Sequence, residues 1–212
     1  MHYLNAHGRL DSVVAPIGQA LEAARRKVEP LVGPVDVDII VQHRPAAIIA
    51  ERGFGGYSPS GDLIELSFDP ANDNLPQNLG LPLQRLTAHE LHHVLRWRGP
   101  GYGDTLGEAL VTEGLAGHFA AEVFGGGPEP WEMAVPRERL AAYLGRVEAL
   151  WEDATYDHFE WFYGEGQLPR WLGYSLGSTL VGRALKATGA SALGWAREPA
   201  TTVRPFLKGM CG

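Results

Sequence analysis

The chain has 212 residues and a formal net charge of −7 at pH 7, with 45% hydrophobic and 20% charged residues, proportions typical of soluble globular proteins. The acidic balance and the lack of a basic run argue against nucleic acid as a partner, and no run reaches the ~18 apolar residues of a membrane-spanning helix. Cys211 is the single cysteine, which excludes an intramolecular disulfide and a cysteine-rich metal site. We expect a single domain over residues 1–212 and, because the first residues lack the pattern of a secretory signal, a cytoplasmic location.

The first third of the chain predicts a helix followed by short strands. Apolar residues recur at helical spacing from Ile17 to Val28, and Pro30 is expected to end this helix. Alternating or β-branched residues predict three strands, at 35–41, 47–51 and 62–68. The Gly- and Ser-rich stretch RGFGGYSPSG between the last two strands predicts a turn or a flexible lip.

Helices are predicted for most of the remaining chain, after a loop at 69–80. Proline starts, glycine stops and apolar spacing place four of them, from Pro82 to Gly99, from Thr105 to Phe124, around 140–151 and at 172–188. The expected fold class is therefore α+β, with a small sheet followed by a helical layer. Because the short strands follow one another directly, we expect the sheet to be mostly antiparallel, with one parallel strand pair as the alternative.

The sequence HELHH at 89–93 contains the pattern His-Glu-x-x-His, formed by His89, Glu90 and His93. On a helix, a spacing of four residues places two imidazoles about 40° apart and one turn along, so that one Zn²⁺ ion can bind both. The intervening Glu90 can then reach a water on the metal rather than the metal itself. His92 is three residues from His89 and lies to the other side, which favours a flanking or supporting role.

A catalytic zinc usually has three protein ligands, and two glutamates of the next predicted helix compete for the third place. Glu108 belongs to TLGE, a Ser/Thr-x-x-Glu capping box with Thr105. Glu113 instead lies among small and apolar helical neighbours, where a carboxylate is costly unless it is paired or bound to a metal. We therefore predict Glu113 as the third ligand; the alternative is an ion pair between Glu113 and a buried arginine.

These residues resemble the gluzincins, the thermolysin-like metallopeptidases with a His-Glu-x-x-His helix and a ligand Glu on a later helix. Nineteen residues separate His93 from Glu113, close to the spacing in that clan. More narrowly, HELHHVLRW, EALVTEGLAGHFAAE and PRWLGYSLGSTLV look like a bacterial family of predicted zinc-dependent proteases of unknown function, over roughly residues 60–190. The resemblance implies zinc binding by His89, His93 and Glu113 and a catalytic Glu90.

One position departs from the gluzincin pattern. Thermolysin-like enzymes have an Asp one turn after the ligand Glu, and it orients a zinc-bound histidine. The corresponding residue here is Gly117. Because such supporting partners fix imidazole orientation and metal affinity, another group is expected to take over this task.

In the expected reaction, Glu90 takes a proton from the attacking water and passes it to the leaving amine. The oxyanion needs a further donor, for which Tyr174 is the first candidate and His158 and Tyr163 come next. The strand at 62–68, or the lip with Gly55, Gly56 and Tyr57 before it, is expected to pair with an extended peptide. A plain hairpin turn explains the two glycines equally well.

The function expected from the sequence is zinc-dependent hydrolysis of peptide bonds in a peptide or protein substrate. One alternative is a zinc amidase that acts on a small metabolite, with the same metal chemistry and a different pocket. Another is a catalytically inactive zinc-binding interaction protein. A purely structural zinc site has a fourth protein ligand and no use for a carboxylate at Glu90, so the motif favours an enzyme.

Overall fold

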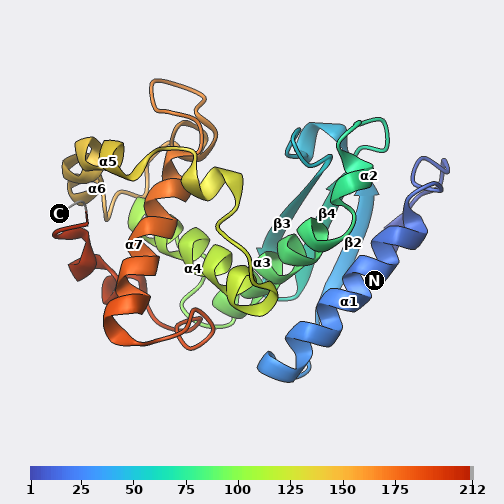
Figure 1. Ribbon diagram of the computed structural model, residues 1–212, viewed down its shortest axis with the longest axis horizontal. Coiled ribbons are helices and arrows are strands. Elements are labelled where there is room, and N and C mark those ends of the chain that lie inside the picture. The colour runs from blue at the N-terminus through green and yellow to red at the C-terminus, as the bar shows by residue number, and fades with distance from the viewer. Residues whose placement is uncertain (211–212) are drawn as a thin grey trace. The chain divides into compact units, whose positions relative to one another are not determined.

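The computed structural model describes residues 1–210, and Cys211 lies outside them. The chain forms two compact units, Met1–Trp97 and the residues from Arg98 onward. The first unit combines a sheet with helices and the second is helical (Figure 1), which confirms the α+β class. The single domain expected over 1–212 stays a prediction.

The first unit is built around a four-stranded sheet with the strand order β1-β2-β4-β3. Its elements are β1 (His2–Leu4), α1 (Val14–Val32), β2 (Asp38–His43), a 3-10 turn (Pro45–Ala47), β3 (Phe54–Ser60), β4 (Leu63–Phe68), α2 (Leu75–Asn78) and α3 (Leu81–Trp97). Because β4 lies between β2 and β3, β3 is an edge strand of the sheet. The predicted peptide pairing along the 62–68 strand is therefore wrong, since β4 already has a partner on each side.

The sheet is mixed and mostly parallel, so the expectation of a mostly antiparallel sheet is wrong. β1 pairs with β2 and β2 with β4 in parallel, while β3 and β4 are antiparallel. The reason is the connection between strands, because a parallel pair needs a long crossover and an antiparallel pair needs only a short turn. The helix α1 supplies the first crossover, and the sequence analysis missed β1, the three-residue strand before it.

Two further assignments around the sheet differ from prediction. The predicted strand at 47–51 contributes only an isolated bridge between Ile49 and Phe54, after the short turn Pro45–Ala47. The predicted turn RGFGGYSPSG contains β3 instead. Glycine and proline disfavour strands locally, and β3 forms because its backbone pairs with β4 from Phe54 opposite Phe68 to Ser60 opposite Leu63.

Two long helices, α1 and α3, contact each other and lie on one face of the sheet (Figure 1). The core between helices and sheet is apolar, with Ile17 of α1, Ile64 of β4 and Leu83 of α3 fully buried. The helix α1 continues two residues past Pro30 to Val32, so the proline lies inside its last turn instead of ending it.

The second unit has a helical pair at its centre, formed by α4 (Leu106–Phe124) and α7 (Leu172–Thr188). The residue ranges of both helices agree with the predicted ranges. The two helices approach closely at Gly114 and Gly177, because a Cβ on Gly114 would overlap the Gly177 carbonyl oxygen and a Cβ on Gly177 would overlap that of Leu110. Small residues at this crossing let the two backbones touch.

The helix predicted around 140–151 is divided into shorter pieces. The remaining helices of this unit are Pro130–Met133 (3-10), α5 (Arg137–Leu140), Ala141–Tyr143 (3-10), α6 (Leu144–Ala149), Phe159–Tyr163 (π), Ala200–Thr202 (3-10) and Arg204–Leu207 (3-10). The apolar residues that suggested one helix are nevertheless buried, at Leu140, Val147 and Trp151. Within residues 1–210, the helices are too short or too polar to cross a membrane.

Candidate metal centre

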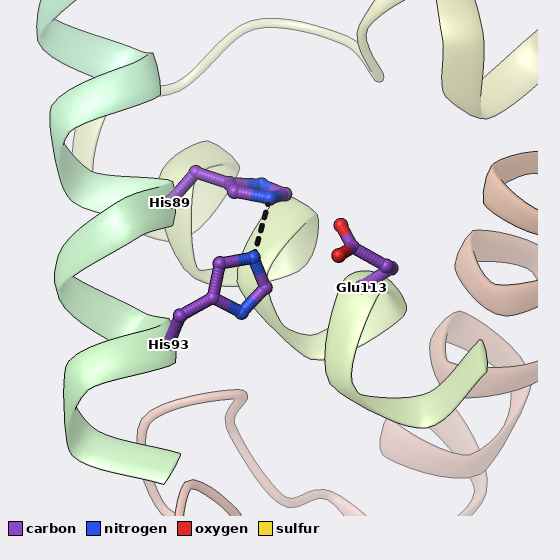
Figure 2. A group of neighbouring side chains, drawn as sticks. All are labelled: His89, His93 and Glu113. Carbon is purple, nitrogen blue, oxygen red and sulfur yellow. Dashed lines mark hydrogen bonds between the residues drawn. The ribbon is translucent and has the colours of Figure 1, made fainter. Parts of the chain in front are cut away.

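The histidine pair of the first unit lies on successive turns of α3 (Figure 2). The Nε2 atoms of His89 and His93 are 3.0 Å apart, and the ring centroids are 4.6 Å apart with nearly perpendicular planes. Two nitrogens bound tetrahedrally to one zinc at 2.0–2.1 Å lie about 3.3 Å from each other. The two Nε2 atoms thus face each other at hydrogen-bond distance, and a small increase of this spacing would fit a shared metal ion.

Glu90, between the two histidines in sequence, is directed toward the edge strand β3. Its side chain is buried, with 3% of its surface exposed. The hydroxyl of Ser58 donates a hydrogen bond to Glu90 Oε2 over 2.7 Å and lies 3.1 Å from the Glu90 carbonyl oxygen. On the same face of β3, a Cβ built on Gly56 would lie 2.5 Å from Glu90 Oε1. The carboxylate therefore packs directly against the backbone of β3.

His92 is fully buried in the first unit. Its position on α3 fits the flanking role that the sequence predicts, because His89 and His93 are the histidines whose nitrogens face each other.

Glu113 lies in the third turn of α4 in the second unit (Figure 2). The predicted capping box is confirmed: Thr105 accepts from the Glu108 backbone, and Glu108 accepts from the Thr105 backbone over 3.0 Å. Glu108 is thereby committed to the helix start. The Glu113 side chain is 7% exposed among small and apolar neighbours, as its helical surroundings predict.

Tyr102 contacts Glu113 and was not singled out by sequence reasoning. Its hydroxyl donates to Glu113 Oε1 over 2.5 Å, and its carbonyl oxygen accepts from the Thr112 hydroxyl over 2.8 Å. Burial raises the pKa of Tyr102 well above its usual value, and the negative charge of Glu113 raises it further. The hydroxyl therefore keeps its proton at neutral pH and remains a donor to the carboxylate.

Further aromatic groups of the second unit lie around Glu113 and Tyr102. Burial raises the pKa of Tyr156 to about 12, with a contribution from Glu113, and the Tyr156 hydroxyl is 3.0 Å from His158 Nδ1. Burial lowers the pKa of His158, and Glu113 opposes this shift. His158 is therefore mostly neutral at pH 7, and Tyr156 is protonated.

Tyr174, the first candidate for an oxyanion donor, lies in the first turn of α7. Its ring makes edge contacts with Phe162 and Tyr163, with centroids 5.0 Å and 6.5 Å away, and its charge when ionised contributes to the raised pKa of Tyr102. The three candidate donors thus belong to one aromatic cluster, since His158 stacks on Phe162 at 4.4 Å. The catalytic role of Tyr174 stays a prediction.

The departure at Gly117 has a structural counterpart in Glu132, on the 3-10 turn Pro130–Met133. A Cβ on Gly117 would overlap Glu132 Oε1. The Glu132 side chain is buried, and Oε2 accepts from the Glu129 backbone over 2.6 Å. A carboxylate from another segment thus fills the space one turn after Glu113, where an Asp side chain would otherwise begin.

The predicted substrate-binding residues all lie on β3. Gly55 packs against the Ala47 carbonyl, so a Cβ there would overlap that oxygen. Gly56 faces Glu90, as Ser58 does. Tyr57 is 63% exposed and, because strand side chains alternate, points to the opposite face. Substrate binding by these residues stays a prediction.

Comparison with known proteins identifies the family of this chain. A family model described as Predicted Zn-dependent protease (DUF2268) matches residues 16–204, nearly the whole chain. The chain belongs to this family. The family description agrees with the resemblance drawn from the motifs and with a donor set of two imidazoles and a carboxylate.

Two proteins from Bacillus subtilis (strain 168) are similar to this chain. The uncharacterized protein YjfC is 29% identical over 115 residues, which is 53% of this chain and 32% of the relative. The uncharacterized protein YjaZ is 31% identical over 132 residues, 59% of this chain and 49% of the relative. The chain thus spans half or less of these relatives. No solved structure matches it.

Proposed function

We propose that this protein is a zinc-dependent hydrolase of peptide bonds, with His89, His93 and Glu113 as the metal ligands. The observation that carries the proposal is the histidine pair of α3, whose Nε2 atoms lie 3.0 Å apart, close to the separation of two nitrogens bound to one zinc. Glu113 is the proposed third ligand because its carboxylate is buried among small and apolar neighbours on α4. Two histidines and one glutamate are a donor set of catalytic zinc sites, which keep a position for water or substrate. The family description supports the choice of zinc.

A bound zinc would supply Lewis-acid polarisation of a carbonyl and a lowered pKa for water. The proton transfers are assigned to residues of the chain. Glu90 accepts the proton of the attacking water, whose oxygen bonds to the carbonyl carbon, and Glu90 then returns this proton to the amine nitrogen as the C–N bond breaks. Burial of Glu90 beside the histidine pair supports this assignment.

The oxyanion that forms at the carbonyl carbon needs a hydrogen-bond donor. Tyr174 is the proposed donor, and His158 is the second candidate. Both belong to the aromatic cluster that interacts with Tyr102, the residue hydrogen-bonded to Glu113. A neutral phenol or imidazole can donate without adding a charge that must be desolvated.

The edge strand β3 is the proposed binding site for an extended peptide. Ile49 N donates to the Phe54 carbonyl, so Phe54 directs its polar backbone groups away from β4. Backbone directions alternate along a strand, which places those of Gly56 on the same outer edge. A peptide that pairs there by β-strand addition lies next to Glu90, because Glu90 packs on Gly56.

The experiment that tests this function combines metal analysis with an unbiased peptide digest. Protein purified without chelator should contain about one zinc per chain and should cleave peptides of a mixed library, and removal of the metal should abolish cleavage. Absence of zinc at this stoichiometry would contradict the metal site. Zinc-loaded protein that cleaves small amides and no peptide would contradict peptide hydrolysis while leaving the metal site intact.

A further inference from the structure

We propose that Ser58 is a positioning residue that holds the Glu90 carboxylate in its working orientation, with Gly56 providing the space that this orientation needs. This inference rests on the proposed function, because it assigns Glu90 the role of general base. It concerns a residue 32 positions away in sequence, on the edge strand where the peptide is proposed to bind.

The first support is the hydrogen bond itself. Ser58 and Glu90 are both almost fully buried, at 4% and 3% exposure, and the 2.7 Å contact joins a hydroxyl donor to a carboxylate oxygen. Hydrogen bonds to a charged acceptor are shorter and about twice as strong as neutral ones. The hydroxyl has one hydrogen, so the 3.1 Å approach to the Glu90 carbonyl oxygen is the weaker of its two contacts.

The second support is the fit of the other carboxylate oxygen against Gly56. A Cβ at this position would lie 2.5 Å from Oε1 and 2.8 Å from Cδ of Glu90, so any other residue there would displace the carboxylate. Ser58 fixes Oε2, and the bare backbone of Gly56 accommodates Oε1. The rotation of the carboxylate group is thereby set, with Oε1 next to the strand edge.

A structural tie between β3 and α3 is the simpler explanation of the Ser58 contact. The structure already has such a tie, since Trp97 Nε1 donates to the Ser58 carbonyl over 2.8 Å. This bond uses the backbone of Ser58 and is unaffected by loss of the hydroxyl. The strand is therefore expected to stay in place when the side chain is shortened, which separates positioning from structural support.

The decisive variants are Ser58→Ala, Glu90→Gln and the two combined, with Ser191→Ala as a control. Ser191 is exposed and lies outside the proposed peptide-binding strand, and its hydroxyl accepts from the Gly194 backbone. Ser58→Thr retains a hydroxyl and should restore part of the activity. For each protein we would measure zinc content and the kcat and KM for fluorescein-labelled casein.

Ser58→Ala should lower kcat by about 10-fold or more, as expected for a misplaced catalytic group, with KM and zinc content nearly unchanged. In the Glu90→Gln background, the same substitution should change kcat less than 2-fold, because there is no base left to position. Ser191→Ala should leave kcat unchanged in both backgrounds. The unfolding midpoint of the zinc-free proteins gives a second measurement that needs no catalytic activity. Glu90→Gln should shift this midpoint less in the Ser58→Ala protein than in the wild type.

Full kcat in Ser58→Ala would overturn the positioning role and leave the proposed function standing. An equal loss of kcat in both backgrounds would also overturn it, since that pattern belongs to a structural residue. Wild-type protein that holds zinc but does not hydrolyse casein or library peptides would overturn the proposed function and this role together. In that case, a Glu90→Gln midpoint shift that depends on the residue at position 58 would still show that Ser58 and Glu90 are in contact.

Discussion

The hydroxyl of Tyr102 donates a 2.5 Å hydrogen bond to Oε1 of Glu113, and the Thr112 hydroxyl holds the Tyr102 backbone. Partners of this kind orient a ligand carboxylate, and their loss typically costs 10- to 100-fold in metal affinity. Tyr102→Phe is therefore expected to weaken zinc binding by about 10-fold. Competition with a chelator of known affinity measures this change.

A matched control for this variant is Tyr143→Phe, on the 3-10 turn Ala141–Tyr143. It removes a phenolic hydroxyl from the same unit without touching Glu113, so zinc affinity should stay at the wild-type value. Equal zinc affinity in the Tyr102 variant and the wild type would show that this hydroxyl does not support a metal ligand.

Glu90→Gln tests the general base. The amide keeps the size of the side chain but cannot accept the proton, so hydrolysis should fall by ~100-fold or more while zinc stays near one equivalent per chain. Glu148→Gln, on α6, makes the same chemical change at an exposed site and should have no effect. Hydrolysis that persists in the Glu90 variant would rule out the proposed mechanism.

Tyr174→Phe tests the oxyanion donor. Removal of one such donor typically lowers kcat by 10²- to 10³-fold, and zinc content should not change, because the ring can still pack on Phe162 and Tyr163. Steady-state kinetics with a library-selected peptide measure the effect. If Tyr174→Phe is fully active and His158→Gln is impaired, the donor is His158 instead.

Gly114→Ala tests the crossing of α4 and α7. The new methyl group would overlap the Gly177 carbonyl, and overpacking of this kind usually costs about 1–3 kcal/mol. Denaturant unfolding should show this loss. Gly145→Ala is the control: its helical site in α6 has no atom within 4 Å of an added Cβ, so stability there should rise by about 0.5–1 kcal/mol. A neutral Gly114 variant would mean that the helices separate easily.

Local patterns were sufficient to predict the elements that carry the proposed metal ligands. Apolar spacing and a capping box defined α4, and the start and stop residues defined α3 and α7. The strand β3 could not be predicted in this way. Its sequence FGGYSPS has poor strand propensity, and its pairing with β4 determines its conformation. The parallel pair of β1 and β2 was missed because β1 is only three residues long.

The residues that support the proposed site were harder to find than its proposed ligands. A His-Glu-x-x-His pattern has a helical spacing that can be read directly, and Glu113 is unusual among its apolar neighbours. Ser58 reaches Glu90 across 32 positions and Tyr102 reaches Glu113 across 11, distances over which sequence spacing carries no geometric information. Glu132 beside Gly117 is likewise a contact between separate segments.

The most direct test of the proposed metal site is a crystal of protein purified without chelator, measured on both sides of the zinc absorption edge. We predict one anomalous peak per chain, within about 2.0–2.2 Å of His89 Nε2, His93 Nε2 and a Glu113 oxygen, the usual zinc bond lengths, with a remaining position open to water. A peak that is absent, bound elsewhere, or closed by a fourth protein ligand would contradict a catalytic zinc at this site.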